Sequence, residues 1–240
     1  MNVQEATTRR LPDLKERHLP ENCRETINTI LKETYGYEQF RNLEIYDDLS
    51  KGKEKLCISQ GQLIENVILE AEKAWKSETQ VDNILLTAPT GSGKSLLFQL
   101  PAIYLGKEYN LLTIVVSPLK ALIVDQVESL QELGYMRVAY ASSDLSPEQK
   151  MEVYRQVREG EIDLFYLSPE LLLSYDIKHF VGERRIGLVV VDEAHTVTTW
   201  GKEFRVDYWF LGRYLTALKQ TLGYNFPLFA LTLSLIHISE

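Results

Sequence analysis

The chain has 240 residues, with 26 Lys and Arg against 34 Asp and Glu, a formal net charge of -8 and 45% hydrophobic residues. This length allows one large α/β domain plus a small accessory piece, and the composition excludes an intrinsically disordered chain. The negative charge argues against a strongly basic nucleic-acid-binding surface, although it allows a local basic groove.

Few features point to an oxidising compartment or to a membrane. Cys23 and Cys57 are too few and too isolated for a disulfide framework or a metal site, which favours a reducing compartment. The first twenty residues lack the apolar stretch of a secretory signal peptide, and no run approaches the length of a membrane span. We therefore expect a cytoplasmic protein without a membrane partner.

The chain changes character near residue 80. Residues 1–80 are a predicted helical preface, with helix-forming composition at 22–34 and 60–76 and a polar stretch at 46–55. From 81 to 232, strands and helices alternate, which predicts an α/β fold with a parallel sheet flanked by helices and right-handed crossovers. The expected strands are 83–88, 111–117, 136–142, 163–168, 186–191 and 226–232, and the expected helices are 94–105, 119–133, 146–159 and 207–222.

The first expected strand runs into an octet, residues 88–95 (APTGSGKS), with the spacing of a phosphate-binding loop. Glycines let the backbone approach a pyrophosphate, and the helix that follows adds a favourable dipole. Lys94 would reach the β- and γ-phosphates, and the Ser95 hydroxyl would bind magnesium. Ala88 replaces the usual first glycine, and an accidental glycine turn is the alternative. The nucleotide-binding candidates are Thr90, Gly91, Ser92, Gly93, Lys94 and Ser95.

A second signal follows the unbroken apolar run 186–191, which is typical of a central parallel strand. Asp192, Glu193 and His195 lie at its carboxyl end, where open α/β sheets bind ligands. Asp192 would hold magnesium, Glu193 would orient and deprotonate the attacking water, and His195 would face the γ-phosphate. The alternative is an acidic helix N-cap with a buried, satisfied histidine.

With these two motifs, the chain resembles the first motor domain of a superfamily 2 helicase. The other segments in the expected order are 117–122 (SPLKAL), 168–170 (SPE) and 230–232 (ALT). Residues 35–41 (YGYEQFR) and 200–205 (WGKEFR) are similar to segments of the RecQ-like branch of DEAD/DEAH-box helicases. The resemblance covers about residues 31–232, and it implies a RecA-like fold that uses ATP and Mg²⁺.

The resemblance also implies site residues. Tyr37 would stack on adenine and Arg41 would bind it, whereas Tyr35 and Phe40 are predicted to lie in the core. The implied nucleic-acid contacts are Ser117, Pro118, Lys120, Ser168, Trp200, Phe204 and Arg205. The last three would couple strand binding to hydrolysis, since aromatic faces stack on any base. For Trp200, capping of the core is the alternative.

The family expects a glutamine three residues after the Phe-Arg pair, and this chain has Glu44 there. Gln60 fits the adenine-reading glutamine of the wider superfamily. A side-chain amide both donates to and accepts from adenine, whereas an ionised carboxylate only accepts. We therefore expect Gln60 to read the base, with Glu44 as the alternative.

After Thr232 the family motif would continue with Ala-Thr, but residues 233–240 read LSLIHISE. This octet resembles the translated end of a transposon-based sequencing adapter, so we exclude it, His237 included, from functional reasoning. The natural protein is expected to continue into a second motor domain that supplies an arginine finger. Because such a finger contributes about 10³ to 10⁵ in rate, the present chain alone should hydrolyse ATP very slowly.

These observations predict an ATP-dependent DNA helicase that acts on single-stranded or forked duplex DNA, and the resemblance implies 3′-to-5′ unwinding. One alternative is an RNA helicase or a defence-system translocase on the same core. Another is a nucleotide- and nucleic-acid-binding module without turnover.

Overall fold

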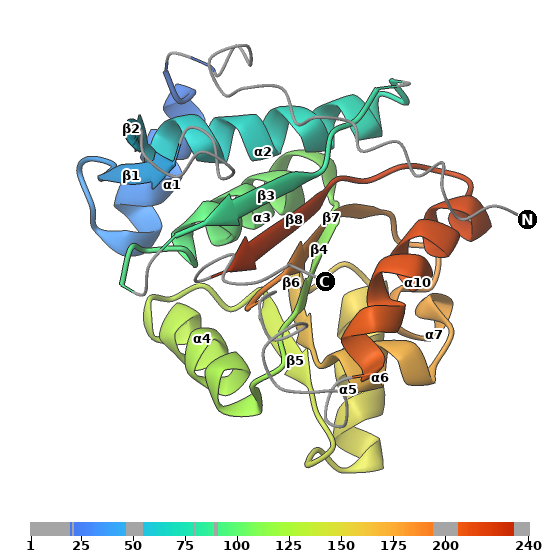
Figure 1. Cartoon of the computed structure of the whole chain (residues 1–240). Coiled ribbons are helices and arrows are strands. Elements are labelled where there is room, and N and C mark those ends of the chain that lie inside the picture. Colours follow the sequence, from blue (N-terminus) through green and yellow to red (C-terminus); the bar gives the residue numbers. More distant parts are fainter. Residues whose placement is uncertain are drawn as a thin grey trace, which may run out of the picture.

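The computed structural model describes residue 20 and residues 22–46, 55–78, 80–88, 91–193 and 206–232. Its centre is a parallel, six-stranded sheet in the order β3-β8-β7-β4-β6-β5 (Figure 1). The strands are β3 (Ile84–Thr87), β4 (Leu112–Val116), β5 (Val138–Ala141), β6 (Leu164–Leu167), β7 (Ile186–Val191) and β8 (Leu228–Thr232). Each strand lies within its predicted range, so the parallel α/β sheet is confirmed.

Helices cover both faces of the sheet (Figure 1). One face carries α1 (Glu25–Tyr35), α2 (Gln60–Trp75), α3 (Leu96–Tyr109) and α4 (Lys120–Glu132). The other carries α5 (Pro147–Arg158), α6 (Pro169–Ser174), α7 (Ile177–Val181) and α10 (Val206–Leu222). Strand alternation sorts the side chains between the two cores: Tyr166 faces the first core and Phe165 the second. Among the described residues, no helix has the length and apolarity needed to cross a membrane.

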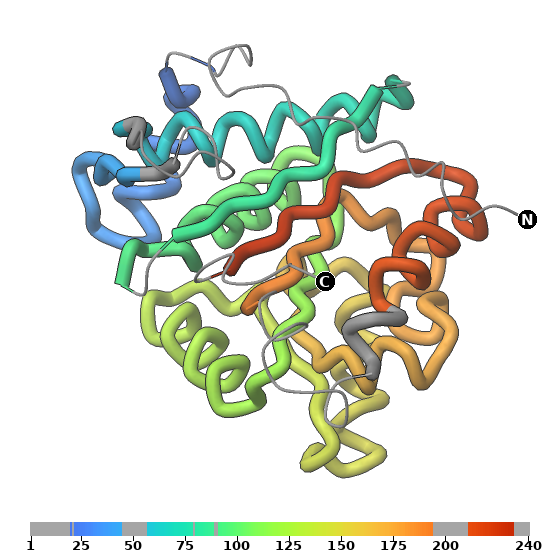
Figure 2. Tube along the Cα trace, in the orientation of Figure 1, coloured from blue at the N-terminus to red at the C-terminus, as the bar shows by residue number. Residues whose placement is uncertain are grey.

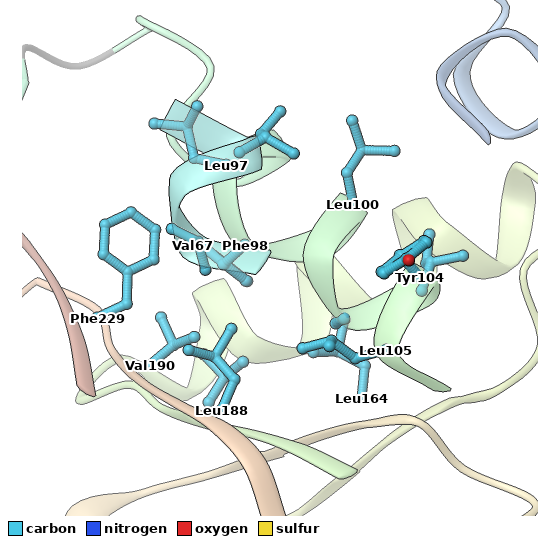
Figure 3. Packing of buried hydrophobic residues seen from close by; sticks show 14 of the residues in the cluster. Val67, Leu97, Phe98, Leu100, Tyr104, Leu105, Leu164, Leu188, Val190 and Phe229 are labelled. Carbon is cyan, nitrogen blue, oxygen red and sulfur yellow. The ribbon is translucent and has the colours of Figure 1, made fainter. Parts of the chain in front are cut away.

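Helix α3 is buried on all sides because it lies between the sheet and the outer helices α1 and α2. All of residues 97–106 are buried, as expected for a helix that is apolar around its whole circumference. Figure 3 shows Phe98 and Leu105 of α3 among Val67 of α2 and Leu188 and Val190 of β7. The helix begins two residues after the predicted start and ends at Tyr109, four residues after the predicted end.

The N-terminal preface contains strands that the sequence analysis did not predict. Strands β1 (Asn42–Tyr46) and β2 (Lys55–Ser59) pair antiparallel between α1 and α2. The predicted polar stretch 46–55 therefore includes the ends of both strands, while 47–54 lie outside the described residues. Two strands of five residues with mixed polarity carry too weak an alternation to stand out in the sequence.

A partly buried ion-pair cluster joins the start of α1 to α2 and α3. Arg24 Nε donates to Glu65 Oε1 (2.8 Å), Arg24 NH1 donates to Glu72 Oε1 (2.6 Å), and Tyr109 OH donates to the same Glu72 oxygen (2.9 Å). Burial opposes ionisation of Glu72, but the hydrogen bonds from Arg24 and Tyr109 outweigh it and lower the pKa of this carboxyl. The preface is thus held to the same core as α3.

The start of α5 agrees with the sequence. Ser146 Oγ accepts from Gln149 N (3.2 Å), Gln149 Oε1 accepts from Ser146 N (2.8 Å), and Pro147 is the first helical residue. Each side chain satisfies a backbone donor at the helix start, which is the capping-box arrangement. The predicted start at residue 146 is therefore confirmed.

Near the C-terminal end of α3, Gly106 faces the fully buried Asp163, which directly precedes β6. The Asp163 carboxylate accepts from Tyr135 OH (2.9 Å), Arg137 Nε (2.6 Å) and Arg184 NH2 (3.0 Å). A Cβ on Gly106 would lie 2.2 Å from Asp163 Cγ. Because three donors hold the Asp163 carboxylate in place, it cannot move away from a methyl group added at Gly106.

We predict that Gly106→Ala lowers the free energy of unfolding by about 1–3 kcal/mol, since the added methyl overpacks this contact. Gly212→Ala is the matched control, because Gly212 lies exposed within α10 and an added Cβ meets no atom within 4 Å. The control should gain about 1 kcal/mol from helix propensity. Urea denaturation of both variants measures the difference, and equal changes would contradict the packing argument.

Candidate functional site

The predicted site residues gather at the carboxyl edge of the sheet. The phosphate loop follows β3, Asp192 follows β7, and Thr232 ends β8, which lies between these two strands. Figure 2 shows that β3 and β8 run side by side although they are far apart in the sequence. Ser117 and Ser168 follow the neighbouring strands β4 and β6. In a parallel sheet this edge is where ligands bind.

The loop after β3 has the backbone of a phosphate cradle. Gly91 and Gly93 have φ of 78° and 77°, a left-handed conformation that L side chains rarely adopt. Ser95 precedes the first turn of α3, and its hydroxyl makes no capping hydrogen bond. Lys94 Nζ donates to the Ala88 carbonyl oxygen (3.2 Å). Ser92 Oγ is buried and has no hydrogen-bond partner within the part of the chain that the structure describes. Thr90 lies outside that part.

Gln60, the first residue of α2, joins the preface to the phosphate loop. It is 2% exposed, its Oε1 accepts from Arg41 N (3.1 Å), and its Nε2 donates to the Ser92 carbonyl oxygen (3.1 Å). Gln60 N also donates to the Arg41 carbonyl oxygen (2.9 Å). The structure thus brings Gln60 against the loop, as the preferred assignment requires, while Glu44 is exposed on β1.

The aromatic residues before Gln60 divide into two groups. Tyr37 is 52% exposed, and its ring stacks on Tyr35 with centroids 6.3 Å apart and an interplanar angle of 17°. Tyr35 and Phe40 pack partly buried against the first core, which confirms the prediction that they are core residues. The exposed face available for a ligand is therefore that of Tyr37.

Asp192 and Glu193 leave β7 at the centre of the edge. Asp192 is 4% exposed, and its N donates to the Val116 carbonyl oxygen (2.9 Å), which extends the pairing of β7 with β4. Burial, reinforced by the Glu193 charge, raises the pKa of Asp192, while Lys94 acts in the opposite direction. Glu193 has φ of 50°, so the chain turns sharply as it leaves the strand. His195 lies outside the described residues.

The sequence analysis missed the side chain that supports Asp192. Gln126 of α4 is 8% exposed, and its Nε2 donates to Asp192 Oδ2 (3.4 Å). A glutamine among the buried positions of a helix, next to Ile123 and Val127, was the available signal. A buried polar side chain needs a partner, and here the partner is the candidate metal ligand.

The expected nucleic-acid contacts are only partly described. Ser117 is buried at the end of β4, and its Oγ has no hydrogen-bond partner among the described residues. Pro118 is half-buried. Lys120 is exposed and forms an ion pair with Asp144. Ser168 Oγ accepts from Leu171 N (3.3 Å) and so caps α6. Trp200, Phe204 and Arg205 lie outside the described residues, as do 233–240.

The sequence model of the DEAD/DEAH box helicase family matches residues 69–224. The chain belongs to this family. It is 30% identical over 187 residues to the ATP-dependent DNA helicase RecQ of Haemophilus influenzae, covering 78% of this chain and 25% of that protein. It is 34% identical over 202 residues to RecQ of Synechocystis, covering 83% and 35%. The RecQ-like resemblance is confirmed, and the chain spans about a quarter to a third of these relatives.

Solved helicase structures share the fold. The DUF1998 helicase MrfA bound to DNA and AMPPNP matches 92% of this chain with a TM-score of 0.57 and 21% identity, over 27% of its own chain. The Hef helicase domain of Pyrococcus furiosus matches 72% of this chain with a TM-score of 0.50 and 22% identity, over 33% of its own chain. At such identities the likeness shows the fold alone, and the RecA-like α/β fold is confirmed.

Gly93 provides a test of the contact between Gln60 and the loop. A Cβ on Gly93 would lie 2.7 Å from Gln60 Nε2, which is held by hydrogen bonding, so Gly93→Ala should displace the amide and break the bond to Ser92. Gly134→Ala is the control, since Gly134 has φ of 86° and an added Cβ meets nothing within 4 Å. Both substitutions put a side chain on a left-handed backbone, which destabilises each variant. Because Gly93→Ala also breaks a hydrogen bond, its free energy of unfolding in urea should fall by about 1 kcal/mol more than that of Gly134→Ala.

The additional loss of unfolding free energy in Gly93→Ala should become smaller in a Gln60→Ala background, because the amide that the new methyl group displaces is then absent. Equal losses of unfolding free energy in Gly93→Ala and Gly134→Ala would mean that the contact with Gln60 does not stabilise the loop.

Proposed function

We propose that the chain is the first motor domain of an ATP-dependent DNA helicase, which binds and hydrolyses ATP with Mg²⁺ in order to move along DNA and unwind it. The observation that carries this proposal is the meeting of the phosphate loop and Asp192–Glu193 at one edge of the sheet, in a member of the DEAD/DEAH box helicase family. The relatives that match most of the chain are named as ATP-dependent DNA helicases.

The phosphate loop would hold the triphosphate. The left-handed glycines would let successive N–H groups of residues 91–95 point at phosphate oxygens, and Lys94 would add a positive charge. The Ser95 hydroxyl and the Asp192 carboxylate are oxygen donors that suit magnesium, and the buried Ser92 hydroxyl suits a phosphate cradle. Magnesium bound by Ser95 and Asp192 would neutralise charge on the transferred phosphoryl group.

Hydrolysis also requires a group that activates water. Glu193 follows the magnesium ligand directly, and we assign it the role of orienting the water and accepting its proton. His195 would sense the γ-phosphate. The base would be read by Gln60, which already lies against the loop, with Tyr37 as the stacking face and Arg41 beside it. For Gln60 to contact adenine, its amide must exchange at least one of its two protein hydrogen bonds for bonds to the base.

DNA would pass over the carboxyl edge at β4 and β6. Ser117, Pro118, Lys120 and the segment at Ser168 would contact the backbone, and Trp200, Phe204 and Arg205 would couple DNA binding to hydrolysis. Lys120 must exchange its Asp144 partner for a phosphate. In the longer protein, we propose 3′-to-5′ unwinding in the cytoplasm, with a second RecA-like domain that closes on the nucleotide and supplies an arginine finger.

We predict that Lys94→Ala abolishes ATP binding, because the main cation of the loop is lost. Lys107→Ala is the control, since Lys107 is exposed near the other end of α3. A fluorescent ATP analogue titrated in the presence of Mg²⁺ measures both affinities. An unchanged affinity in Lys94→Ala would refute the assignment of the loop. Glu193→Gln should bind normally and lose any residual turnover, because the amide cannot accept the proton.

We predict that Trp200→Ala in the longer protein leaves basal ATP hydrolysis unchanged and removes its stimulation by single-stranded DNA. Trp75→Ala is the control, because Trp75 lies at the C-terminal end of α2, away from the carboxyl edge, and should keep the stimulation. Steady-state ATPase rates with and without DNA measure the effect. Normal stimulation in Trp200→Ala would return this side chain to a core-capping role.

A further inference from the structure

A chain of polar side chains crosses the otherwise apolar layer between the sheet and its helices. Tyr35 OH donates to Gln99 Oε1 (2.9 Å), and Gln99 Nε2 donates to Tyr166 OH (3.3 Å). Tyr166 OH donates to Gln126 Oε1 (3.0 Å), and Gln126 Nε2 donates to Asp192 Oδ2 (3.4 Å). We call Gln99, Tyr166 and Gln126 the polar relay. It joins the end of α1 to the end of β7 through α3, β6 and α4.

The relay is buried along its whole length. The exposed fractions are 5% for Gln99, 0% for Tyr166 and 8% for Gln126. Three polar side chains in such a place do not improve stability over well-packed apolar ones, because burying them costs about as much as their hydrogen bonds return. What these side chains contribute is the orientation of the groups that they contact.

Each bond of the relay fixes the direction of the next. Because the Tyr35 hydroxyl donates to Gln99 Oε1, the Gln99 amide must present its NH₂ group to Tyr166. Tyr166 then directs its own proton to Gln126 Oε1. The Gln126 amide is left with its NH₂ group toward Asp192. The orientation of every donor is thus set by its neighbour, and the last donor meets a carboxylate.

At that carboxylate, the two oxygens are held by different donors. Asp192 Oδ1 accepts from Glu193 N (2.9 Å), and Oδ2 accepts from Gln126 Nε2. Two donors fix the rotation of the carboxylate plane and leave one lone pair on each oxygen for another ligand. Partners that orient a metal ligand in this way typically contribute 10- to 100-fold in metal affinity.

We propose that Gln126, Tyr166 and Gln99 are positioning residues that set the Asp192 carboxylate for magnesium. This inference rests on the proposed function, because it takes Asp192 as the magnesium ligand. At the end away from Asp192, the relay accepts a hydrogen bond from Tyr35, whose ring stacks on the exposed Tyr37. The relay therefore also connects the segment assigned to the base with the residue assigned to the metal.

The test is isothermal titration of AMPPNP into this chain, once with Mg²⁺ and once with EDTA. Gln126→Leu should weaken binding about tenfold with Mg²⁺ and leave binding in EDTA unchanged, because only the metal contribution depends on Asp192. Tyr166→Phe, which removes a single oxygen atom, should produce a smaller loss of the same kind. Tyr135→Phe is the matched control, since its hydroxyl also donates to a buried aspartate, Asp163, at the opposite edge of the sheet.

Circular dichroism and thermal melting verify that each variant is folded, and Tyr166→Phe carries the test if Gln126→Leu does not fold. Equal losses with Mg²⁺ and with EDTA would overturn the proposal, because they indicate general loosening of the site. Unchanged binding of both variants beside a normal wild-type titration would overturn it as well. A wild-type chain that bound no AMPPNP in either buffer would instead refute the proposed function, and with it the role of the relay.

Discussion

The structure depends above all on the burial of α3 between the sheet and the helices α1 and α2. The phosphate loop runs directly into this helix, so the position of the loop is set by packing on every side of α3. The same helix carries Gly106 against Asp163, Tyr104 against Arg24 and Gln99 within the polar relay. A nucleotide on the loop would therefore rest on a helix that is packed on all sides.

The preface contacts both the phosphate loop and α3. Gln60 holds the Arg41 backbone on one side and the Ser92 carbonyl on the other, and Arg24 joins α1 to α2 and α3. Gln60 thus links the Arg41 backbone to the loop, while Phe40 and Tyr35 pack against the first core. The segment proposed to read the base is therefore connected to the phosphate loop through the buried Gln60, and to Asp192 through Tyr35 and the polar relay.

The sequence predicted the sheet well because buried parallel strands are unbroken apolar runs, as in 186–191, and because glycine spacing marks the loop. The antiparallel pair β1–β2 and the short helices α6 and α7 were missed, since five or six residues give too little periodicity. The polar relay was missed for another reason. A lone Gln126 in a helix resembles a surface residue, and Tyr166 resembles an ordinary core aromatic. Only the folded structure, in which Gln126 of α4 meets Tyr166 of β6 and the end of β7, makes them partners of Asp192.

Strand order has a consequence for how the protein forms. Within the described part of the chain, β3 pairs only with β8, which is the last strand in the sequence and also pairs with β7. The strand that leads into the phosphate loop must therefore wait until about 140 further residues have been synthesised before its backbone groups find their partner. Such long-range pairing slows folding. The ability to bind nucleotide should consequently appear only after β8 has been synthesised and has paired with β3.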